Sequence, residues 1–195
     1  MNRKKIKMKT KKHKNLRKIN FIFCILGLGM LQISEASTFS LKSEVIKEGS
    51  TILAEQVFNS FGCSGLNKSP DLEWSNAPKD TKAFALTVFD KDAPTGSGWW
   101  HWVVINIPNH QQSLPLGASG NKGLIGGLET RTDFGMPGYG GPCPPLKSGK
   151  HRYIFTVYAL KELIPVDQEA SAAMVGFYIH NLKIAEAKIS AQYSR

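Results

Sequence analysis

Two acidic residues and a histidine lie where two apolar segments approach each other in the sequence. Asp90 and Asp92 follow the apolar run 84–89, and His101 precedes the apolar run 103–107. Apolar runs of this length, bounded by proline and glycine, are typical of buried β-strands, and the segment between them predicts a loop. Carboxylates and imidazoles at adjacent strand ends can bind a ligand or transfer protons. This stretch therefore predicts a polar site held by two strands.

A second set of polar groups lies further along the chain. His151 and Tyr153 begin the segment 151–160, whose pattern predicts a strand with both residues on one face. The preceding segment 114–150 contains ten glycines, and a loop of this length is usually functional. Its stretch YGGPCPP, at 139–145, could direct backbone N–H groups at an anion. With the tryptophans near the first set as apolar walls, these groups predict a small-ligand pocket.

Each of these groups also has a structural interpretation. The acids could cap a turn, which aspartate often does. The histidines could be buried and hydrogen-bonded, and Trp99, Trp100 and Trp102 could belong to the core. The functional interpretation is favoured because the groups gather at strand ends beside a long loop rich in glycine and proline.

The remaining segments predict a mostly β domain with peripheral helices. Short apolar or alternating runs predict strands at 38–46, 51–58 and 71–78. Towards the C-terminus, apolar residues at helical spacing predict two helices, at 168–177 and 181–192. We expect one mostly antiparallel β domain without internal repeats.

The first 36 residues have the features of a secretory signal peptide in the required order. Ten lysines and arginines precede the apolar core 21–31, which is too short to span a bilayer comfortably. Small residues then predict cleavage after Ala36. We therefore expect a signal peptide over 1–36, a mature domain over 37–195, and a periplasmic or secreted protein. The alternatives are a basic nucleic-acid arm and an uncleaved anchor.

Removal of this leader changes the charge of the protein. The full chain has a formal net charge of +10, but the leader contains ten basic residues and one acid, Glu35. Fifteen basic and fourteen acidic side chains remain, so the net charge falls to about +1. The mature domain therefore gives no electrostatic argument for a nucleic-acid partner. Cys24 lacks the preceding small residues of a lipoprotein signal, so we expect no stable membrane anchor.

Two cysteines, Cys63 and Cys143, remain after the leader. An even number of cysteines in an exported protein favours a disulfide, and we expect these two to be bridged. Two unpaired thiols are the alternative.

Four motifs together resemble the phosphatidylethanolamine-binding proteins, also called Raf kinase inhibitor-like proteins. They are DKDAPTGSGWWHWVVINIP, TRTDFG, YGGPCPP and GKHRYIFTVYAL, in the order that the family has them, and the resemblance is to its bacterial branch. It covers nearly all of the domain after the leader. It implies an antiparallel Greek-key β-sandwich with a small pocket for phosphate-like head groups. In some members it also implies phosphorylated or kinase partners.

The resemblance carries the family's pocket onto particular residues of this chain. The ligand-binding residues that it implies are Asp90, Asp92, Pro94, His101, Gly140, Gly141, Pro144, Pro145, His151 and Tyr153. The chain departs from the family at Lys91, where proline is usual. Lysine relaxes the constraint on φ there and adds a cation beside the acids.

The two acids cannot both face a bound anion, because they would repel it. We expect Asp90 and Asp92 to orient His101, His151 or backbone N–H groups instead. A carboxylate partner raises the pKa of a histidine, and burial lowers it. If the carboxylate prevails, anion affinity should fall as the pH rises through the histidine pKa.

Three classes of function compete. We favour an exported module that binds a small anion or a phosphorylated head group, without catalytic residues, metal or cofactor. The second class is an inhibitor or interaction protein that acts on a kinase or a protease. The oligomeric state is a separate question, and a homodimer is one alternative. The third is a hydrolase with histidine and aspartate as acid and base. Against it, Cys143 is expected to be oxidised, and no serine motif of the G-x-S-x-G kind occurs.

Overall fold

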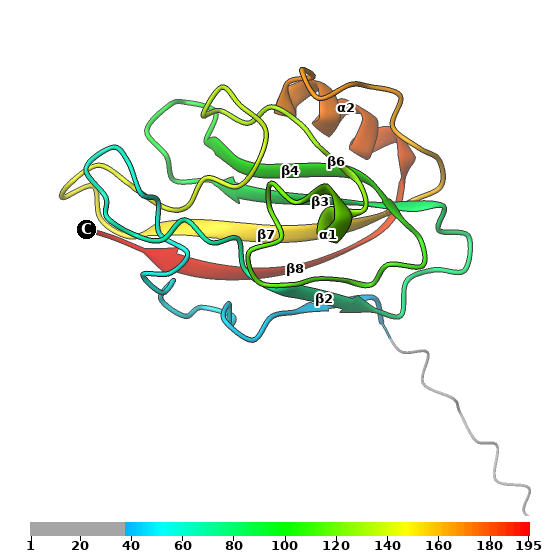
Figure 1. Ribbon diagram of the computed structural model, residues 1–195, viewed down its shortest axis with the longest axis horizontal. Helices are drawn as coiled ribbons and strands as arrows, with labels where there is room; N and C mark the ends of the chain where they lie inside the picture. Colours follow the sequence, from blue (N-terminus) through cyan, green and yellow to red (C-terminus); the bar gives the residue numbers. More distant parts are fainter. Residues whose placement is uncertain (1–37) are drawn as a thin grey trace, which may run out of the picture. The chain divides into compact units, whose positions relative to one another are not determined.

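The computed structural model describes residues 38–195 (Figure 1). The predicted signal peptide, 1–36, and its cleavage site lie outside these residues. Within the described range, two short helices accompany the strands: α1 (Lys122–Ile125) and α2 (Ala172–Leu182). Neither has the length and the hydropathy that a membrane-spanning helix requires.

The strands of the described part form two sheets in which all pairs are antiparallel. The smaller sheet has the order β1-β2-β5, and the larger has the order β6-β4-β3-β7-β8. Their bounds are Ser40–Lys42 (β1), Leu72–Ser75 (β2), Ala83–Asp90 (β3), Trp99–Pro108 (β4), Ser113–Leu114 (β5), Leu128–Glu129 (β6), His151–Leu160 (β7) and Lys183–Tyr193 (β8). The predicted mostly β, antiparallel fold class is confirmed. The Greek-key path stays a prediction.

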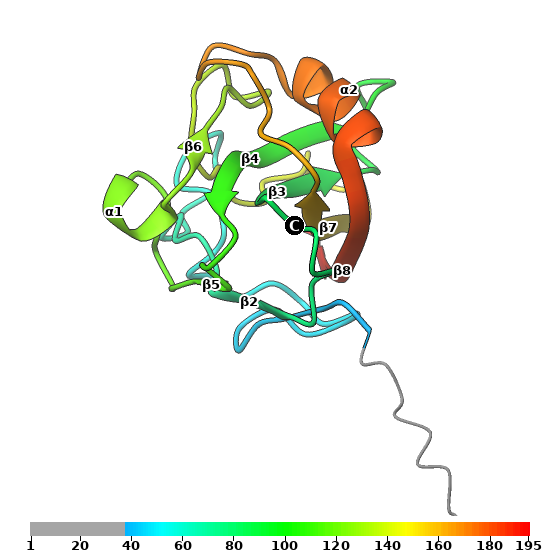
Figure 2. The same ribbon diagram turned by 90° about the vertical axis from the view of Figure 1, so that its right-hand side faces the viewer.

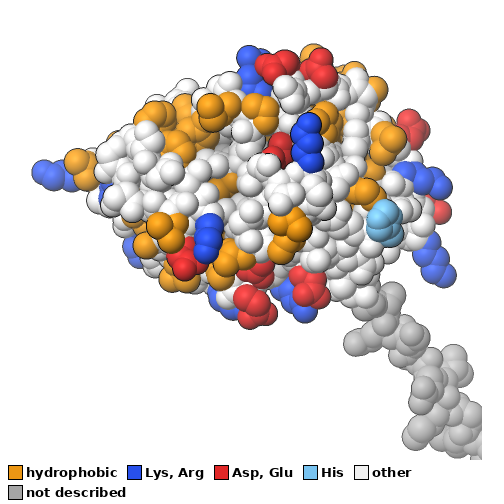
Figure 3. Space-filling model, viewed as in Figure 1, with side chains coloured by type: hydrophobic (Ala, Val, Ile, Leu, Met, Phe, Trp, Pro, Cys, Tyr) orange, Lys and Arg blue, Asp and Glu red, His pale blue; other side chains and the backbone are white. Residues whose placement is uncertain are grey.

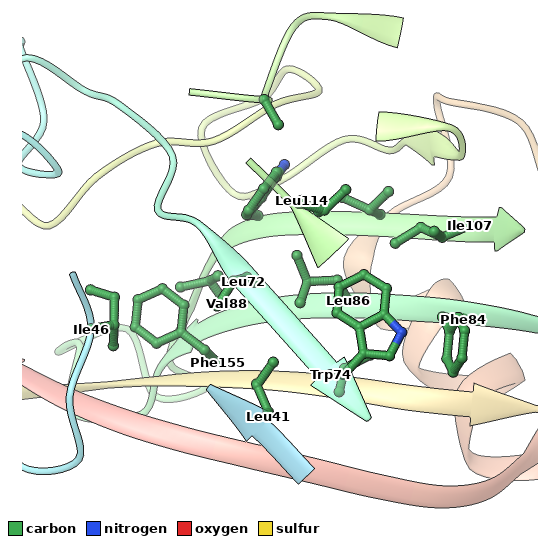
Figure 4. Packing of buried hydrophobic residues seen from close by; sticks show 14 of the residues in the cluster. Leu41, Ile46, Leu72, Trp74, Phe84, Leu86, Val88, Ile107, Leu114 and Phe155 are labelled. Carbon is green, nitrogen blue, oxygen red and sulfur yellow. The ribbon is translucent and has the colours of Figure 1, made fainter. Parts of the chain in front are cut away.

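The main hydrophobic core joins the two sheets. Trp74 of β2 packs against Phe84 of β3, with 5.3 Å between ring centroids, and both are fully buried (Figure 4). Leu86 and Phe155 continue this core along β3 and β7. The predicted single face of β7 is confirmed, because its odd-numbered residues from 151 to 157 are all buried.

A second core lies on the opposite face of the larger sheet. Val175 and Ile179 of α2 pack there with Ala85 of β3 and Val103 of β4. In Figure 2, α2 and the strands β2 and β5 accordingly lie on opposite sides of the larger sheet. Both faces of β3 are therefore covered, which explains its almost continuous apolar sequence AFALTVFD. The central strands can then hold polar groups rigidly at their ends.

The predicted helix at 181–192 is wrong, because the chain from Lys183 onward is the edge strand β8. It pairs with β7 from His151↔Tyr193 to Leu160↔Lys183. Its apolar positions 185, 187, 189, 191 and 193 alternate with polar ones, which is the period of a strand. The alanines favour a helix intrinsically, but pairing along the length of β7 outweighs that preference.

Three other predicted elements have different bounds in the structure. No strand covers 51–58; in this segment Thr51 alone forms a bridge, to Gln192, and turns follow it. The strand predicted at 38–46 is only β1. The helix predicted at 168–177 begins later, because the hydroxyl of Ser171 caps it by accepting a hydrogen bond from the Met174 N–H.

Candidate functional site

A cavity of about 210 Å³ opens where β3, β4 and β7 meet the surrounding loops. Of the residues predicted for the site, those lining it are Asp90, Pro94, His101, Pro144, Pro145, His151 and Tyr153. Three others, Asp92, Gly140 and Gly141, lie outside the lining. Strand pairing explains the grouping, because Asp90 is opposite Trp99 on one side and Tyr153 on the other.

Asp90 and His151 form a buried pair at the floor of the pocket. Asp90 Oδ2 is 2.7 Å from His151 Nδ1, and the two residues are 3% and 2% exposed. The other carboxylate oxygen, Oδ1, accepts a hydrogen bond from the Asp92 N–H at 2.9 Å. On its far side, His151 Nε2 is hydrogen-bonded to Ser148 Oγ at 2.9 Å. Both imidazole nitrogens therefore have protein partners, and Asp90 orients His151 as the sequence led us to expect.

Asp92 holds a loop in place instead of facing the cavity. Its carboxylate accepts a hydrogen bond from the Arg152 N–H at 2.9 Å, and the Arg152 guanidinium lies 3.9 Å away. These contacts attach the loop after β3 to β7. The prediction that one acid would bind a backbone N–H is confirmed by this contact.

His101 is fixed by the loop that crosses above it. Its Nδ1 donates a hydrogen bond to the Gly140 carbonyl at 2.6 Å, and the Gly140 N–H donates to the His101 carbonyl at 2.9 Å. Burial lowers the pKa of His101 to about 4, and this effect exceeds the opposing influence of the Gly140 carbonyl and of Asp90. His101 is therefore neutral at pH 7. With Nδ1 protonated, the remaining nitrogen, Nε2, is a hydrogen-bond acceptor.

Gly140 and Gly141 shape the pocket without touching the cavity. A Cβ at Gly140 would overlap the Phe134 ring, and one at Gly141 would overlap the Gln56 carbonyl, so only glycine fits. Asn67 holds this loop with both ends of its amide: Oδ1 accepts from the Gly141 N–H at 2.7 Å, and Nδ2 donates to the carbonyl of residue 139 at 3.1 Å. This role of Asn67 was not predicted from the sequence.

Tyr153 lies in the wall of the pocket, with its hydroxyl buried. Tyr153 is 1% exposed. Its hydroxyl lies near the Asp90 carboxylate, but among the described residues no group is placed well enough to form a hydrogen bond with it. Burial raises the pKa of Tyr153, and the nearby Asp90 carboxylate raises it further. The hydroxyl therefore keeps its proton and remains a donor at any ordinary pH.

Aromatic side chains form the outer walls of the cavity. Trp99 is one of the tryptophans predicted to form the walls. Its ring is nearly perpendicular to that of Phe134, with 5.4 Å between the ring centroids. Phe61 and Phe134 also line the cavity, with centroids 6.0 Å apart, and neither was singled out from the sequence. Phe134 belongs to the TRTDFG motif, which was a usable signal. Nothing in the sequence around Phe61 distinguishes it.

The predicted disulfide Cys63–Cys143 is confirmed, with 6.0 Å between the Cα atoms. Cys143 lines the cavity, so the bridge joins the pocket loop to the loop that carries Phe61. The Arg195 guanidinium adds hydrogen bonds to the carbonyls of Phe61 and Pro144. In Figure 3, hydrophobic side chains are exposed at the end of the molecule where these loops lie in Figure 1.

Within residues 38–195, no three histidine, cysteine or acidic side chains lie close enough together to hold a metal ion. The polar groups of the pocket are instead hydrogen-bonded to one another or directed at the cavity.

Residues 42–194 match the family model of the phosphatidylethanolamine-binding proteins. The chain belongs to this family. It is 48% identical over 164 residues to the UPF0098 protein YbcL of Escherichia coli K12, covering 82% of this chain and 90% of that protein. It is 50% identical over 159 residues to the UPF0098 protein YbhB of the same organism, covering 79% of this chain and 99% of that protein. The resemblance to the bacterial branch is thereby confirmed.

Solved structures agree with this assignment. The crystal structure of Escherichia coli YbcL, described as a member of the mammalian PEBP family, superposes with a TM-score of 0.78 at 47% identity. It covers 82% of this chain and 99% of that one. A phosphatidylethanolamine-binding protein homologue from Chlamydia trachomatis gives a TM-score of 0.70 at 28% identity, covering 81% of this chain and 98% of that one.

Proposed function

We propose that the pocket binds a small anion or the phosphorylated head group of a larger molecule. Family membership supports phospholipid or anion binding in general. The cavity of about 210 Å³ is large enough for a head group and is walled by aromatic rings, with a few polar groups at its floor. This combination is usual for small-ligand sites.

The observation that carries the proposal is the hydroxyl of Tyr153. It is a buried donor on a residue that lines the cavity. The Asp90 carboxylate is nearby but already accepts from His151 and from the Asp92 N–H, and among the described residues no acceptor is placed well enough to bind the hydroxyl. A buried polar group without a hydrogen-bond partner destabilises the protein. A ligand oxygen that accepts a hydrogen bond from the hydroxyl would remove this unfavourable free energy and so favour binding. An oxygen of a phosphate or carboxylate group is such an acceptor.

His101 adds a second requirement to the ligand. Its neutral Nε2 accepts a hydrogen bond, and its ring lines the cavity. A phosphate group that keeps one proton can donate to Nε2 while another of its oxygens accepts from Tyr153. Asp90 does not oppose such a ligand strongly, because both of its oxygens already have protein donors.

The test is titration calorimetry with inorganic phosphate and with phosphoethanolamine. Tyr153→Phe keeps the ring and removes the hydroxyl, so we expect affinity to fall by about ten- to a hundredfold, the loss of one hydrogen bond to a charged group. His101→Ala should weaken binding by about the same factor, and His151→Ala should do so indirectly, through the floor of the pocket. Tyr178→Phe, in α2 and outside the cavity lining, is the matched control. Unchanged affinity in the Tyr153 and His101 variants, with normal melting temperatures, would mean that the pocket is not the anion site.

A protein partner is the second candidate, and exposed apolar side chains favour it. Phe61 at the cavity and Leu146 beside Pro145 are 64% and 71% exposed. Hydrophobic side chains gathered at one place on a surface often mark an interaction site. If a kinase or protease forms a stoichiometric complex with the wild type, Phe61→Ser and Leu146→Ser should both weaken that complex. Leu146→Ser, outside the cavity lining, should leave phosphate binding in place.

A further inference from the structure

A serine, a histidine and an aspartate form a hydrogen-bonded chain at the edge of the pocket. Ser148 Oγ is 2.9 Å from His151 Nε2, and His151 Nδ1 is 2.7 Å from Asp90 Oδ2. These are the atoms and the order that activate a serine nucleophile: the aspartate holds the imidazole, and the imidazole takes the serine proton. Such triads are recognised by geometry and not by sequence motif, so the absence of G-x-S-x-G does not exclude one.

The three residues also differ in exposure as such a chain requires. Asp90 and His151 are buried, whereas Ser148 is exposed to solvent. A substrate can therefore reach the hydroxyl while the groups behind it stay shielded from water. The cavity lined by His151 and Pro145 lies next to the serine and can hold one part of that substrate.

The turn that carries Ser148 has an unusual backbone. Lys147, which precedes it, has φ 63°, a conformation that side chains other than glycine adopt rarely. Gly149, which follows it, has φ 89°. Strained positions of this kind cluster at functional sites, and nucleophilic serines often lie on sharp turns. Among the described residues the Gly149 N–H has no backbone acceptor.

The serine proton has two acceptors within reach. Ser148 Oγ also lies 2.7 Å from the Pro145 carbonyl, which can only accept. Rotation about the Cβ–Oγ bond moves the proton from this carbonyl to His151 Nε2. The second position is the one from which an activated alkoxide can form.

We propose that Ser148 is a nucleophile that hydrolyses small carboxylic esters, with His151 as the general base and acid and Asp90 as the positioning residue. This activity goes beyond ligand binding and uses one wall of the same pocket.

The reaction needs only the ester and water. Ser148 Oγ adds to the ester carbonyl carbon while His151 Nε2 takes the hydroxyl proton. The bond from this carbon to the alcohol oxygen then breaks, and the alcohol leaves with the proton from Nε2. Water next adds to the acyl-serine and gives its proton to Nε2. The carboxylic acid departs, and the proton returns to Ser148.

The first test uses a fluorophosphonate probe on the wild-type protein. Attack by Ser148 forms an O–P bond and releases fluoride, which leaves one covalent adduct per chain. We expect intact mass to show this adduct and peptide sequencing to place it on Ser148. Ser148→Ala should abolish labelling, and Ser40→Ala, a surface serine of β1 outside the cavity, should label like the wild type. No adduct, or an adduct on another residue, would overturn the proposal.

The second test measures hydrolysis of p-nitrophenyl acetate. We expect Ser148→Ala to lower the rate by about a hundredfold or more, as for other triads. Asp90→Asn should lower kcat with little change in KM, which loss of pocket shape would not produce. Because exposed imidazoles can cleave this ester slowly, an unchanged rate in Ser148→Ala would assign turnover to them and refute the role of Ser148. Phosphate calorimetry on the wild type separates this proposal from the binding function, because a protein that binds phosphate but gives no adduct on Ser148 would support binding and refute the nucleophile.

Discussion

The two pocket histidines have different hydrogen-bond partners. His151 has a carboxylate on Nδ1 and a hydroxyl on Nε2. His101 has only a backbone carbonyl on Nδ1, and its attraction to Asp90 is smaller than the cost of burying a charge. Anion affinity was expected to fall with rising pH only if a carboxylate raised the histidine pKa more than burial lowered it. At His101 burial has the larger effect, so this condition is not met. Between pH 5 and 8 its charge does not change.

The pKa of His101 predicts how stability depends on pH. Burial lowers it from 6.5 in the unfolded chain to about 4 in the folded protein. The unfolded state therefore binds more protons between these values, and stability is lost as the pH falls from about 6.5 to about 4. At about 1.4 kcal/mol per pKa unit, the free energy of unfolding should drop by roughly 3 kcal/mol from this residue alone.

Urea unfolding at pH 7 and pH 4 checks this, through the difference between the wild type and His101→Gln. Contributions from other groups cancel in that difference, because a glutamine does not titrate. His110→Gln, at an exposed histidine, should show no such change. A constant difference between wild type and His101→Gln across this pH range would show that His101 is not buried in a neutral form.

At the scale of elements, the strands that build the pocket could be predicted and the edge of the sheet could not. The central strands β3, β4 and β7 combine length, apolar composition and flanking polar residues, and they lie where the sequence indicated. The strand β8 is rich in alanine, a strong helix former, and the apolar positions 185, 189 and 193 fit a helical spacing as well as the period of a strand. Pairing with β7 decides between the two. Helical spacing of the apolar residues was the wrong criterion there.

The loops around the pocket depend on the disulfide between them. Cys143→Ser removes the bridge that joins the pocket loop to the Phe61 loop. In the chain-entropy model, closing a loop of this length stabilises the protein by at most about 4–5 kcal/mol. We expect the free energy of unfolding to fall by up to this amount and phosphate affinity to weaken together.

Chemical unfolding and calorimetry on Cys143→Ser measure both effects. The double variant Cys63→Ser, Cys143→Ser controls for the free thiol that the single variant leaves. A thiol reagent should not label Cys63 or Cys143 in the wild-type protein when it is unfolded without reduction. Two reactive thiols per chain would contradict the bridge. An unchanged free energy of unfolding in the double variant would show that the disulfide does not stabilise the protein.

At the scale of the whole molecule, the pocket is assembled from segments that only the fold brings together. The motifs around Asp90, His101 and His151 could be predicted, because each joins a strand to a polar end. Phe61 and Asn67 could not, since both lie in an irregular loop whose place is set by contacts with residues 72 or more positions away. Ser148 was missed for a similar reason: its significance depends on the two residues behind it.

The last prediction concerns where the protein resides. A basic segment, an apolar core and small residues at 34 and 36 predict a cleaved leader, and the disulfide is consistent with an oxidising compartment. We expect a mature chain that begins at Ser37, in the periplasm or the medium, with Cys63 and Cys143 oxidised. Intact-mass analysis of fractionated cells, with and without thiol alkylation, measures the start and the redox state together. A soluble cytoplasmic form that retains residues 1–36, with Cys63 and Cys143 both alkylated, would contradict export. In that form the leader would be uncleaved and the disulfide would be absent.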